Sequence, residues 1–290
     1  MTGQSLHQPV LLQSTIDSLK ITPNEAYLDC TVGSAGHAVE ILKKGGKLFG
    51  LDVDPAALKR AKVRLEKIPN AFFRLKKHNF SQLKTAADHW GLTSVAGILL
   101  DLGLSTEQLA DTARGFTFQT DAPLDMRADP DLKVTASDLV NGLTKGELND
   151  LFKKYGQEQY SLAIANGIAR ARRHQKIQST LELAQLVTRY KPKRGRIHPA
   201  TKVFQALRMA VNDELNHLKA CLPQAVKLLK PKGRLCVISF HSLEDKIIKQ
   251  YFKTNQHLKI ITNKPIIPTQ EEITKNPRSR SAKLRVAQKI

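Results

Sequence analysis

Short apolar runs alternate with helix-like segments along the first hundred residues of the chain. Four of these runs are typical of strands, at residues 26–30, 47–53, 71–75 and 95–102. The segment 55–68 begins with a proline that suits the first turn of a helix and has apolar side chains at helical spacing. Because strands that alternate with helices pair in parallel, the pattern predicts a doubly wound, Rossmann-like α/β sheet.

The alternation ends with the fourth strand. A loop rich in Gly, Asp and Phe occupies residues 113–131, and helical segments follow to about residue 190. Two of these helices are predicted to begin at capping boxes, Thr144 with Glu147 and Ser179 with Glu182.

The sheet pattern resumes toward the C-terminus. In order, we expect a long helix from about Pro199 until Pro223 interrupts it, a strand at 231–240, a helix at 242–252 and a final edge strand at 281–290. Residues 1–108 and 201–290 should therefore form one sheet domain, and residues 109–200 an all-helical domain inserted into it.

Positive charge dominates the composition. The 46 Lys and Arg residues outnumber the 26 Asp and Glu residues, which gives a net charge of +20. Ten basic residues and a single acid lie between Arg170 and Lys202, and six basic residues and no acid lie between Thr274 and Ile290. Such blocks favour a nucleic acid held through its phosphates, without distinguishing RNA from DNA.

Membrane and secreted classes are disfavoured. The apolar runs are far shorter than the roughly 20 residues that cross a bilayer, and residues 1–13 lack the regions of a signal peptide. Cys30, Cys221 and Cys236 are odd in number, widely spaced and form no C-x-x-C pair. Neither a disulfide framework nor a cysteine zinc site is expected, which fits a protein of the reducing cytoplasm.

The turn after the first strand, "DCTVGSAGH" at residues 29–37, resembles a ligand-binding loop. It lacks both the full G-x-G-x-x-G fingerprint of a dinucleotide site and the Gly-Lys-Ser/Thr of a phosphate loop. Asp29, Asp52 and Asp101 end the first, second and fourth strands, so we expect three carboxylates in one crevice.

A carboxylate after the second strand can accept from both hydroxyls of a ribose, which suits a nucleoside cofactor without a pyrophosphate. S-adenosylmethionine fits, because its sulfonium and amino acid parts can lie against Asp29 and the turn while its ribose meets Asp52. The alternative is that Asp29 and Asp52 cap helices and that Gly33 and Gly36 are ordinary turn glycines.

Nine motifs follow one another along the chain: "HQPVLL" (7–12), "DCTVGSAGH" (29–37), "LDVDP" (51–55), "ILLDLGLSTEQL" (98–109), "RGFTF" with "PLDMR" (114–127), "YGQE" (155–158), "HPATKVFQALRMAVNDEL" (198–215), "GRLCVISFHSLEDKIIK" (233–249) and "NPRSRSAKLR" (276–285). Together they resemble the bacterial small-subunit rRNA cytosine-N4 methyltransferase family over nearly the whole chain.

The resemblance implies a class I methyltransferase that uses S-adenosylmethionine to methylate the exocyclic N4 amine of a cytidine in the decoding region of 16S rRNA. Residues 1–108 and 201–290 would form the methyltransferase domain, and residues 109–200 the substrate-recognition domain. Cofactor contacts are implied at Ala35, Gly36, His37, Asp52, Phe80, Asp101 and Gln108. The family's loop usually reads G-x-G-G-H, and Ala35 replaces one glycine, so we expect a slightly reshaped turn that still binds.

Methyl transfer to an amine requires in-line positioning and an acceptor for the amine hydrogens. We expect Asp101 to be the catalytic acceptor, with Ser105 as a second one. The "DLGLS" segment lacks the proline-proline-aromatic motif of DNA amino-methyltransferases. The aromatic ring that stacks on the base would then come from elsewhere, with Phe116 and Phe118 as candidates.

Two other positions have two interpretations each. Ser239 and His241 suit either contact with the target nucleotide or the start of a helix at Ser242 with Asp245. His37 suits either a structural role in the turn or a catalytic one. No cluster of His and carboxylate residues has a convincing metal-ligand spacing, so no metal held by the protein is expected. A magnesium ion that bridges phosphates stays open as an alternative.

The basic residues of the inserted domain form the predicted rRNA-positioning surface: Arg170, Arg172, Arg173, Lys193, Arg194 and Arg196. Two other functions remain open, a non-catalytic ribosome-assembly factor and a DNA cytosine-N4 methyltransferase. The sequence does not determine the oligomeric state, and a homodimer is compatible with it.

Overall fold

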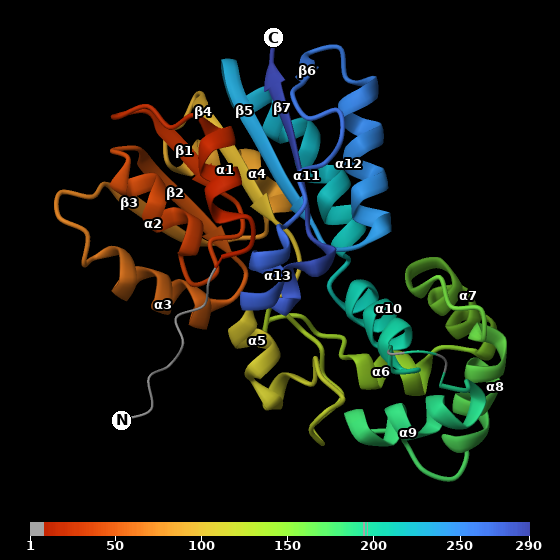
Figure 1. Ribbon diagram of the computed structural model, residues 1–290. Coiled ribbons are helices and arrows are strands. Elements are labelled where there is room, and N and C mark those ends of the chain that lie inside the picture. Colours follow the sequence, from red (N-terminus) through yellow and green to blue (C-terminus); the bar gives the residue numbers. More distant parts are fainter. Residues whose placement is uncertain (1–8, 194, 196) are drawn as a thin grey trace. The chain divides into compact units, whose positions relative to one another are not determined.

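A computed structural model describes residues 9–193, 195 and 197–290. The chain forms two compact units (Figure 1): unit 1 comprises residues up to Gly103 together with Leu215–Ile290, and unit 2 comprises Leu104–Glu214. The insertion was expected at 109–200, and unit 2 extends beyond both of those limits.

Unit 1 is built on a seven-stranded sheet of order β3-β2-β1-β4-β5-β7-β6. Its strands are β1 Ala26–Asp29, β2 Lys47–Asp52, β3 Phe73–Lys77, β4 Val95–Asp101, β5 Leu229–Ser239, β6 Leu258–Ile260 and β7 Lys283–Lys289. Strands β1 to β5 pair in parallel, and β7 is antiparallel to both β5 and β6. This is the class I methyltransferase arrangement, which confirms the predicted fold class. The expected edge position of the last strand is wrong, because the short β6 pairs along its outer side.

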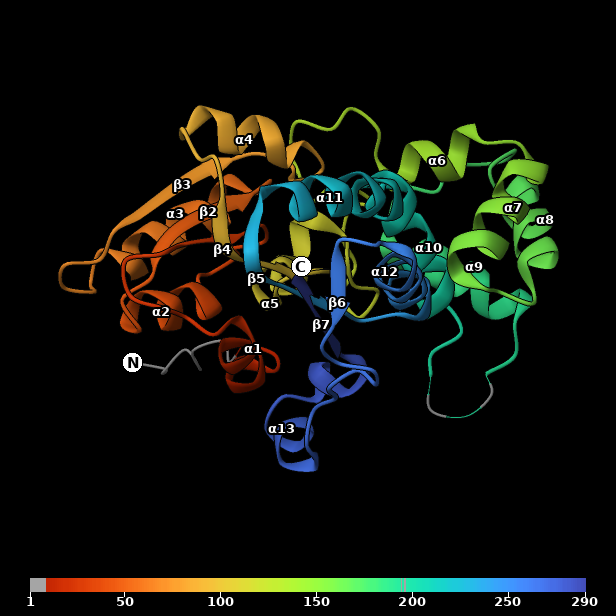
Figure 2. The same ribbon diagram turned by 90° about the horizontal axis from the view of Figure 1, so that it is seen from above.

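Helices cover both faces of the sheet (Figure 2). The helices of unit 1 are α1 Leu12–Leu19, α2 Gly36–Lys43, α3 Pro55–Leu65, α4 Leu83–His89, α11 Glu214–Leu228, α12 Ser242–Thr254 and α13 Gln270–Lys275. Helices α1, α2 and α3 contribute to one buried cluster, through residues such as Ile16, Ile41 and Leu65. Helices α4, α11 and α12 contribute to the other, through residues such as Leu222 and Ile248.

Unit 2 is helical, with its own core. Its helices are α5 Thr106–Ala110, α6 Ala136–Gly142, α7 Lys145–Gly156, α8 Ser161–Ala171, α9 Thr180–Tyr190 and α10 Thr201–Val211. Both predicted capping boxes form, at the starts of α7 and α9. Phe152, Leu183 and Leu207 are fully buried in this core. Because α10 supplies several core residues, unit 2 extends past the expected end at residue 200.

The single long helix predicted from Pro199 to Pro223 is wrong. Helix α10 ends at Val211, and Asp213 has a left-handed backbone with φ 47° before α11 begins. The Asn212 side chain accepts from the Ala128 amide and donates to the Met126 carbonyl, so long-range contacts hold the break. Pro223 lies inside α11 and does not end it.

The remaining predictions from composition concern membranes and cysteines. None of the helices formed by the described residues is long and apolar enough to cross a bilayer. Cys30, Cys221 and Cys236 are buried free thiols.

Gly156 marks the close approach of α7 and α10, and its replacement should destabilise unit 2. A Cβ atom there would lie 2.6 Å from the Lys202 carbonyl oxygen and 3.3 Å from the Ala206 Cβ, so the helices must move apart. We expect Gly156→Ala to lower the free energy of unfolding by about 1–3 kcal/mol. The matched control is Gly142→Ala at the end of α6, where a Cβ meets nothing within 4 Å. Urea unfolding followed by circular dichroism checks this, and equal midpoints for the two variants would contradict it.

Candidate active site

The turn between β1 and α2 is tied to the end of β2. Gly33 and Ala35 both have left-handed backbones, with φ 51° and 65°. The Gly33 amide donates to Asp52 Oδ2 at 2.8 Å, and the Ala35 amide donates to the Val32 carbonyl at 2.7 Å. These contacts fix the loop that the sequence predicted as a ligand-binding turn.

Ala35 adopts a conformation that favours glycine. A left-handed backbone costs an L-residue roughly 1–2 kcal/mol. Two arginines of α3 hold the same turn from outside: Arg64 Nη1 donates to the Ser34 carbonyl at 3.1 Å, and Arg60 Nε donates weakly to Ser34 Oγ at 3.4 Å. Ala35 therefore keeps a left-handed backbone without a glycine and is stabilised by its neighbours, and the reshaped turn expected from this alanine is wrong. Nothing in the sequence pointed to either arginine.

Gly36 is required by packing. A Cβ atom on it would overlap the ring of Pro9, with 2.1 Å to Cγ. The segment at residues 9–11 therefore lies directly against the start of α2.

The Asp52 carboxylate closes the turn. Besides Gly33, it accepts from the Asp54 amide through Oδ1 at 2.9 Å. The helix cap expected as the alternative role is made by Asp54, which accepts from the Ala56 amide at the start of α3. Burial raises the pKa of Asp52 to about 6, while the donated amides of Asp54 and Gly33 lower it. Each carboxylate oxygen has a second lone pair, so Asp52 can still accept from a sugar hydroxyl.

Asp29 and Asp101 end neighbouring strands, as the sequence predicted. The Thr31 amide donates to Asp29 Oδ1 at 3.1 Å, and the Asp101 amide donates to Thr31 Oγ1 at 2.7 Å. Burial raises the pKa of Asp29 to about 7. Burial also raises the pKa of Asp101 well above its usual range, and the charges of Asp29 and Glu244 add to this. Asp101 Oδ1 is buried and has no hydrogen-bond partner among the described residues.

His37 lies beside Asp101. Its Nδ1 is 3.6 Å from Asp101 Oδ2, and its Nε2 is 3.1 Å from the Val10 carbonyl oxygen. A carbonyl can only accept, so this contact assigns the proton to Nε2 and leaves a lone pair on Nδ1 of the neutral ring. His37 therefore links the N-terminal segment to the carboxylate expected to carry the chemistry.

Phe80 follows the end of β3, at the start of a short 3-10 turn. Asn79 precedes it and accepts from the Ser81 amide, while its side-chain amide nitrogen lies 3.1 Å from His217 Nδ1 of α11. The Phe80 and His217 rings meet edge to face at 6.3 Å. Unit 1 thus brings six of the predicted site residues to one region: Ala35, Gly36, His37, Asp52, Phe80 and Asp101.

Comparison with known proteins identifies the family of the chain. The sequence matches the MraW methylase family over residues 4–290. Proteins called ribosomal RNA small subunit methyltransferase H are 45% identical in Dehalococcoides mccartyi, 46% in Thermomicrobium roseum and 44% in Heliobacterium mobile. Each alignment covers 98% of this chain, and 86%, 94% and 99% of those proteins respectively. The chain belongs to the MraW methylase family. The family expected from the motifs is confirmed.

Two of the site residues predicted for this MraW family member lie in unit 2. Ser105 and Gln108 form a capping box at the start of α5: Ser105 Oγ accepts from the Gln108 amide, and Gln108 Oε1 accepts from the Ser105 amide. Gln108 is buried. Their catalytic and cofactor roles remain predictions.

The proposed stacking aromatics are also in unit 2, where they pack. Phe116 belongs to the buried core. The Phe118 ring stacks on His198 at 4.6 Å and meets Phe204 edge to face at 5.0 Å.

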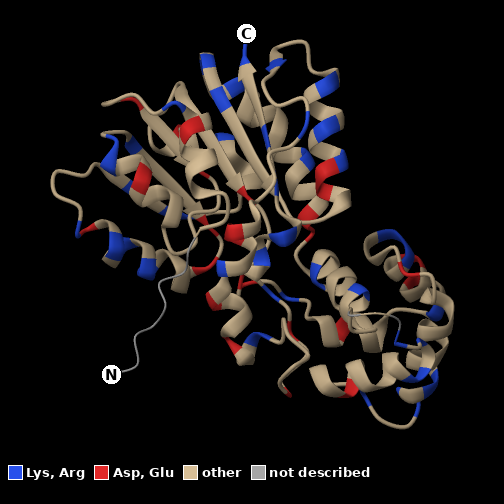
Figure 3. Ribbon diagram, in the orientation of Figure 1, with Lys and Arg blue, Asp and Glu red and all other residues tan. Residues whose placement is uncertain are grey.

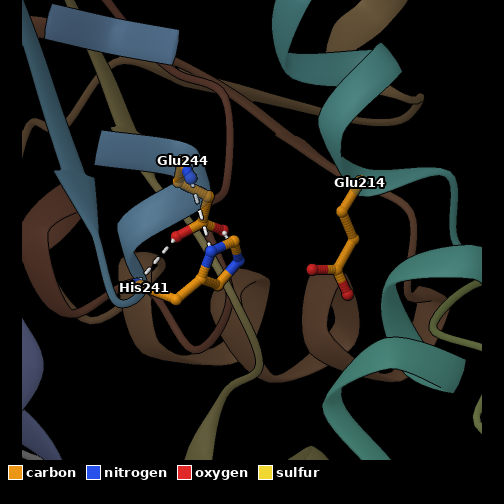
Figure 4. A group of neighbouring side chains, drawn as sticks. All are labelled: Glu214, His241 and Glu244. Carbon is orange, nitrogen blue, oxygen red and sulfur yellow. Dashed lines mark hydrogen bonds and ion pairs between the residues drawn. The ribbon is translucent and has the colours of Figure 1, made fainter. Parts of the chain in front are cut away.

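Helix α12 begins at Ser242 as predicted, but its N-cap is His241 and not Ser242. His241 Nδ1 accepts from the Glu244 amide at 3.3 Å, and Glu244 Oε2 accepts from the His241 amide (Figure 4). His241 Nε2 lies 3.1 Å from Glu244 Oε1 at an angle unsuited to a hydrogen bond, so that contact is electrostatic. Asp245 instead pairs with Arg285. Ser239 is buried, with no partner for its hydroxyl among the described residues.

Lys and Arg residues occur throughout both units (Figure 3), and the predicted RNA-binding cations differ in their exposure and partners. Arg170, Arg173 and Lys193 are exposed. Arg172 donates to the Val140 carbonyl at 2.7 Å, so one of its guanidinium donors is already engaged within unit 2. Arg194 and Arg196 lie outside the described residues.

Asp29→Asn should flatten the pH dependence of stability. The folded pKa of Asp29, about 7, lies above its ordinary value of 3.8, so the native state holds a proton that the unfolded state releases. The free energy of unfolding that this proton contributes is fully present below pH 4 and is lost as the pH rises to 7. Asn stays neutral and its oxygen can still accept from Thr31. We expect the free energy of unfolding at pH 8 to rise by about 2 kcal/mol after the cost of a buried amide is included. Exposed Asp17→Asn is the control, and parallel curves of the Asp29→Asn variant and wild type from pH 4 to 8 would contradict the prediction.

Proposed function

We propose that this protein uses S-adenosylmethionine to methylate the exocyclic N4 amine of a cytidine in the decoding region of 16S rRNA, within the small ribosomal subunit in the cytoplasm. The relatives' shared name supports the substrate, and the motifs support the position on the base. The observation that carries the chemistry is Asp101, whose carboxylate lies at the end of the central strand β4. One of its oxygens is buried and has no hydrogen-bond partner among the described residues.

The residues at this end of the sheet fit S-adenosylmethionine. The turn at 33–37 is held open by Asp52 and by the arginines of α3, so it can receive the amino acid part. Asp52 keeps lone pairs for the ribose, and Phe80 is only half-buried, which leaves ring surface for an adenine. Gln108 and Ala35 complete the proposed cofactor set. The bound cofactor supplies an electrophilic methyl group on a sulfonium.

Asp101 would position the amine and receive its proton. An ionised Asp101 accepts a hydrogen bond from the attacking N4 amine, which holds the nitrogen lone pair in line with the methyl group. As the nitrogen gains a methyl group it must lose one hydrogen, and Asp101 takes that proton. His37 Nδ1 lies 3.6 Å from the same carboxylate and can share the proton with it. Ser105 is the proposed second acceptor.

The RNA would be positioned by exposed cations of unit 2. Phosphate contacts fix the register of a nucleic acid and do not select the base, so the pocket must do so. A target base has to be unstacked before it can reach the half-buried Asp101 carboxylate. Arg170, Arg173 and Lys193 are the described residues that can serve, with Arg172 in a partly structural role.

The function is tested with small subunits that lack the modification. Incubation with labelled S-adenosylmethionine and digestion to nucleosides should yield labelled N4-methylcytidine or its 2′-O-methylated form. Label on another base or on protein would refute the proposed specificity. Bound subunits without any label would indicate a non-catalytic assembly factor, and methylation of duplex DNA instead of subunits would indicate a DNA enzyme.

Asp101→Asn should abolish most turnover while the fold remains. The amide keeps the size of the carboxyl but cannot receive a proton, so we expect kcat to fall about 100-fold or more. In wild type, the rate should fall as pH is lowered through the raised pKa of Asp101, because the protonated carboxyl no longer accepts. Single-turnover methylation with saturating cofactor measures this. Near-normal turnover with an unchanged melting temperature would contradict the role of Asp101.

A further inference from the structure

The second block of positive charge, at residues 274–290, has no role in the function proposed above. Four of its six basic residues are engaged within unit 1. Lys275 pairs with Glu271 at 2.6 Å. Lys283 and Arg285 pair with Asp245 at 3.2 and 2.6 Å.

Lys289 donates to backbone carbonyls at the amino end of β5. Arg278 and Arg280, in contrast, are exposed and form no ion pair or hydrogen bond with any described residue. Their charges are therefore available to a partner.

These two arginines lie at the end of the sheet where the parallel strands finish, which is also where the predicted chemistry takes place. They belong to a 3-10 turn, η3 Pro277–Ser281, which leads directly into β7. Strand β7 begins opposite the end of β5, with Leu284 beside Ile238, and Ile238 lies beside Asp101. Two strand spacings of about 4.8 Å separate Leu284 from Asp101. In Figure 1, α13 and the turn after it lie at the starting end of β7.

The turn is fixed to unit 1. Ser279 is fully buried, and its hydroxyl and amide both donate to the Asn276 carbonyl, at 2.8 and 2.9 Å. A 3-10 helix places successive side chains about 120° apart. With Ser279 directed inward, the arginines on either side face solvent. The preceding helix α13 is tied down as well, since the Leu11 amide donates to Glu272 at 2.6 Å.

We propose that Arg278 and Arg280 bind backbone phosphates of the substrate RNA beside the target nucleotide. The proposal rests on the proposed function and deepens it. The guanidinium fork matches phosphate geometry, and a turn that is already fixed loses little backbone freedom on binding. These contacts would be made by the unit that holds the methyl donor, in addition to those made by the exposed cations of unit 2.

The test compares binding of the full-length protein, with S-adenosylhomocysteine present, to small subunits that lack the modification. Arg278→Gln with Arg280→Gln should weaken affinity about tenfold or more and reduce the slope of log K against log salt by roughly 1–2. Arg278→Lys with Arg280→Lys should restore most of the salt slope. The control is Lys44→Gln with Lys232→Gln, which removes two exposed charges at the opposite end of the sheet and should change little.

Three results distinguish the possibilities. Equal affinity and salt slope in the Gln variant and the control would overturn the proposal, while the function would stand if wild type still methylates. A loss of affinity for S-adenosylhomocysteine alone would also overturn it, because the arginines would then belong to the cofactor pocket. If wild type binds subunits but transfers no methyl group, the proposed function fails, and the same binding comparison still decides the role of the arginines.

Discussion

The hydrogen bond from the Gly33 amide to the Asp52 carboxylate joins two segments on which the rest of the site depends. It connects the turn after β1 with the end of β2, so Asp52, the proposed ribose acceptor, and the backbone donors of the turn are set in place together. Helix α3 begins three residues after Asp52, and two of its arginines donate back to Ser34. Hydrogen bonds of about 1 kcal/mol each can offset the left-handed strain at Ala35, which explains how the turn tolerates alanine.

Desolvation raises the pKa of the two acids at the carboxyl ends of β1 and β4. Asp29 and Asp101 end adjacent strands, and desolvation favours the protonated form of both. Asp29 is satisfied by the Thr31 amide, whereas Asp101 keeps one oxygen without a described partner. The two carboxyls therefore differ in their partners, and Asp101 keeps one buried oxygen for the proposed hydrogen bond to the amine. Perturbed carboxyls of this kind concentrate at functional sites.

Local signals predicted well, and long-range contacts account for most of the errors. The strands other than the short β6 and the capping boxes at Thr144 and Ser179 depend on neighbouring residues, and they were predicted close to their observed positions. The break after α10 depends on Asn212 bonding to residues 126 and 128, which no periodicity reveals. Ser105 and Gln108 have the same capping-box spacing, and that signal was available in the sequence. The contacts of Arg60 and Arg64 with Ser34 could not be found, because they depend on how α3 packs against the turn.

The net charge indicated a nucleic-acid partner, but it did not indicate which basic residues are available to bind one. A net charge of +20 attracts RNA over distance, yet salt screens exposed charges beyond about 8–10 Å, so binding depends on the cations that touch phosphate. A run of basic residues does not show which of them are already engaged, as Arg172 and Arg285 demonstrate. Only the structure separates these from Arg278 and Arg280. Asp29 is buried and Asp52 and Asp101 are half-buried at the carboxyl ends of their strands, whereas the arginines are exposed on the turn that leads into β7. The proposed phosphate contacts and the proposed amine chemistry can therefore coexist on one unit without neutralising each other.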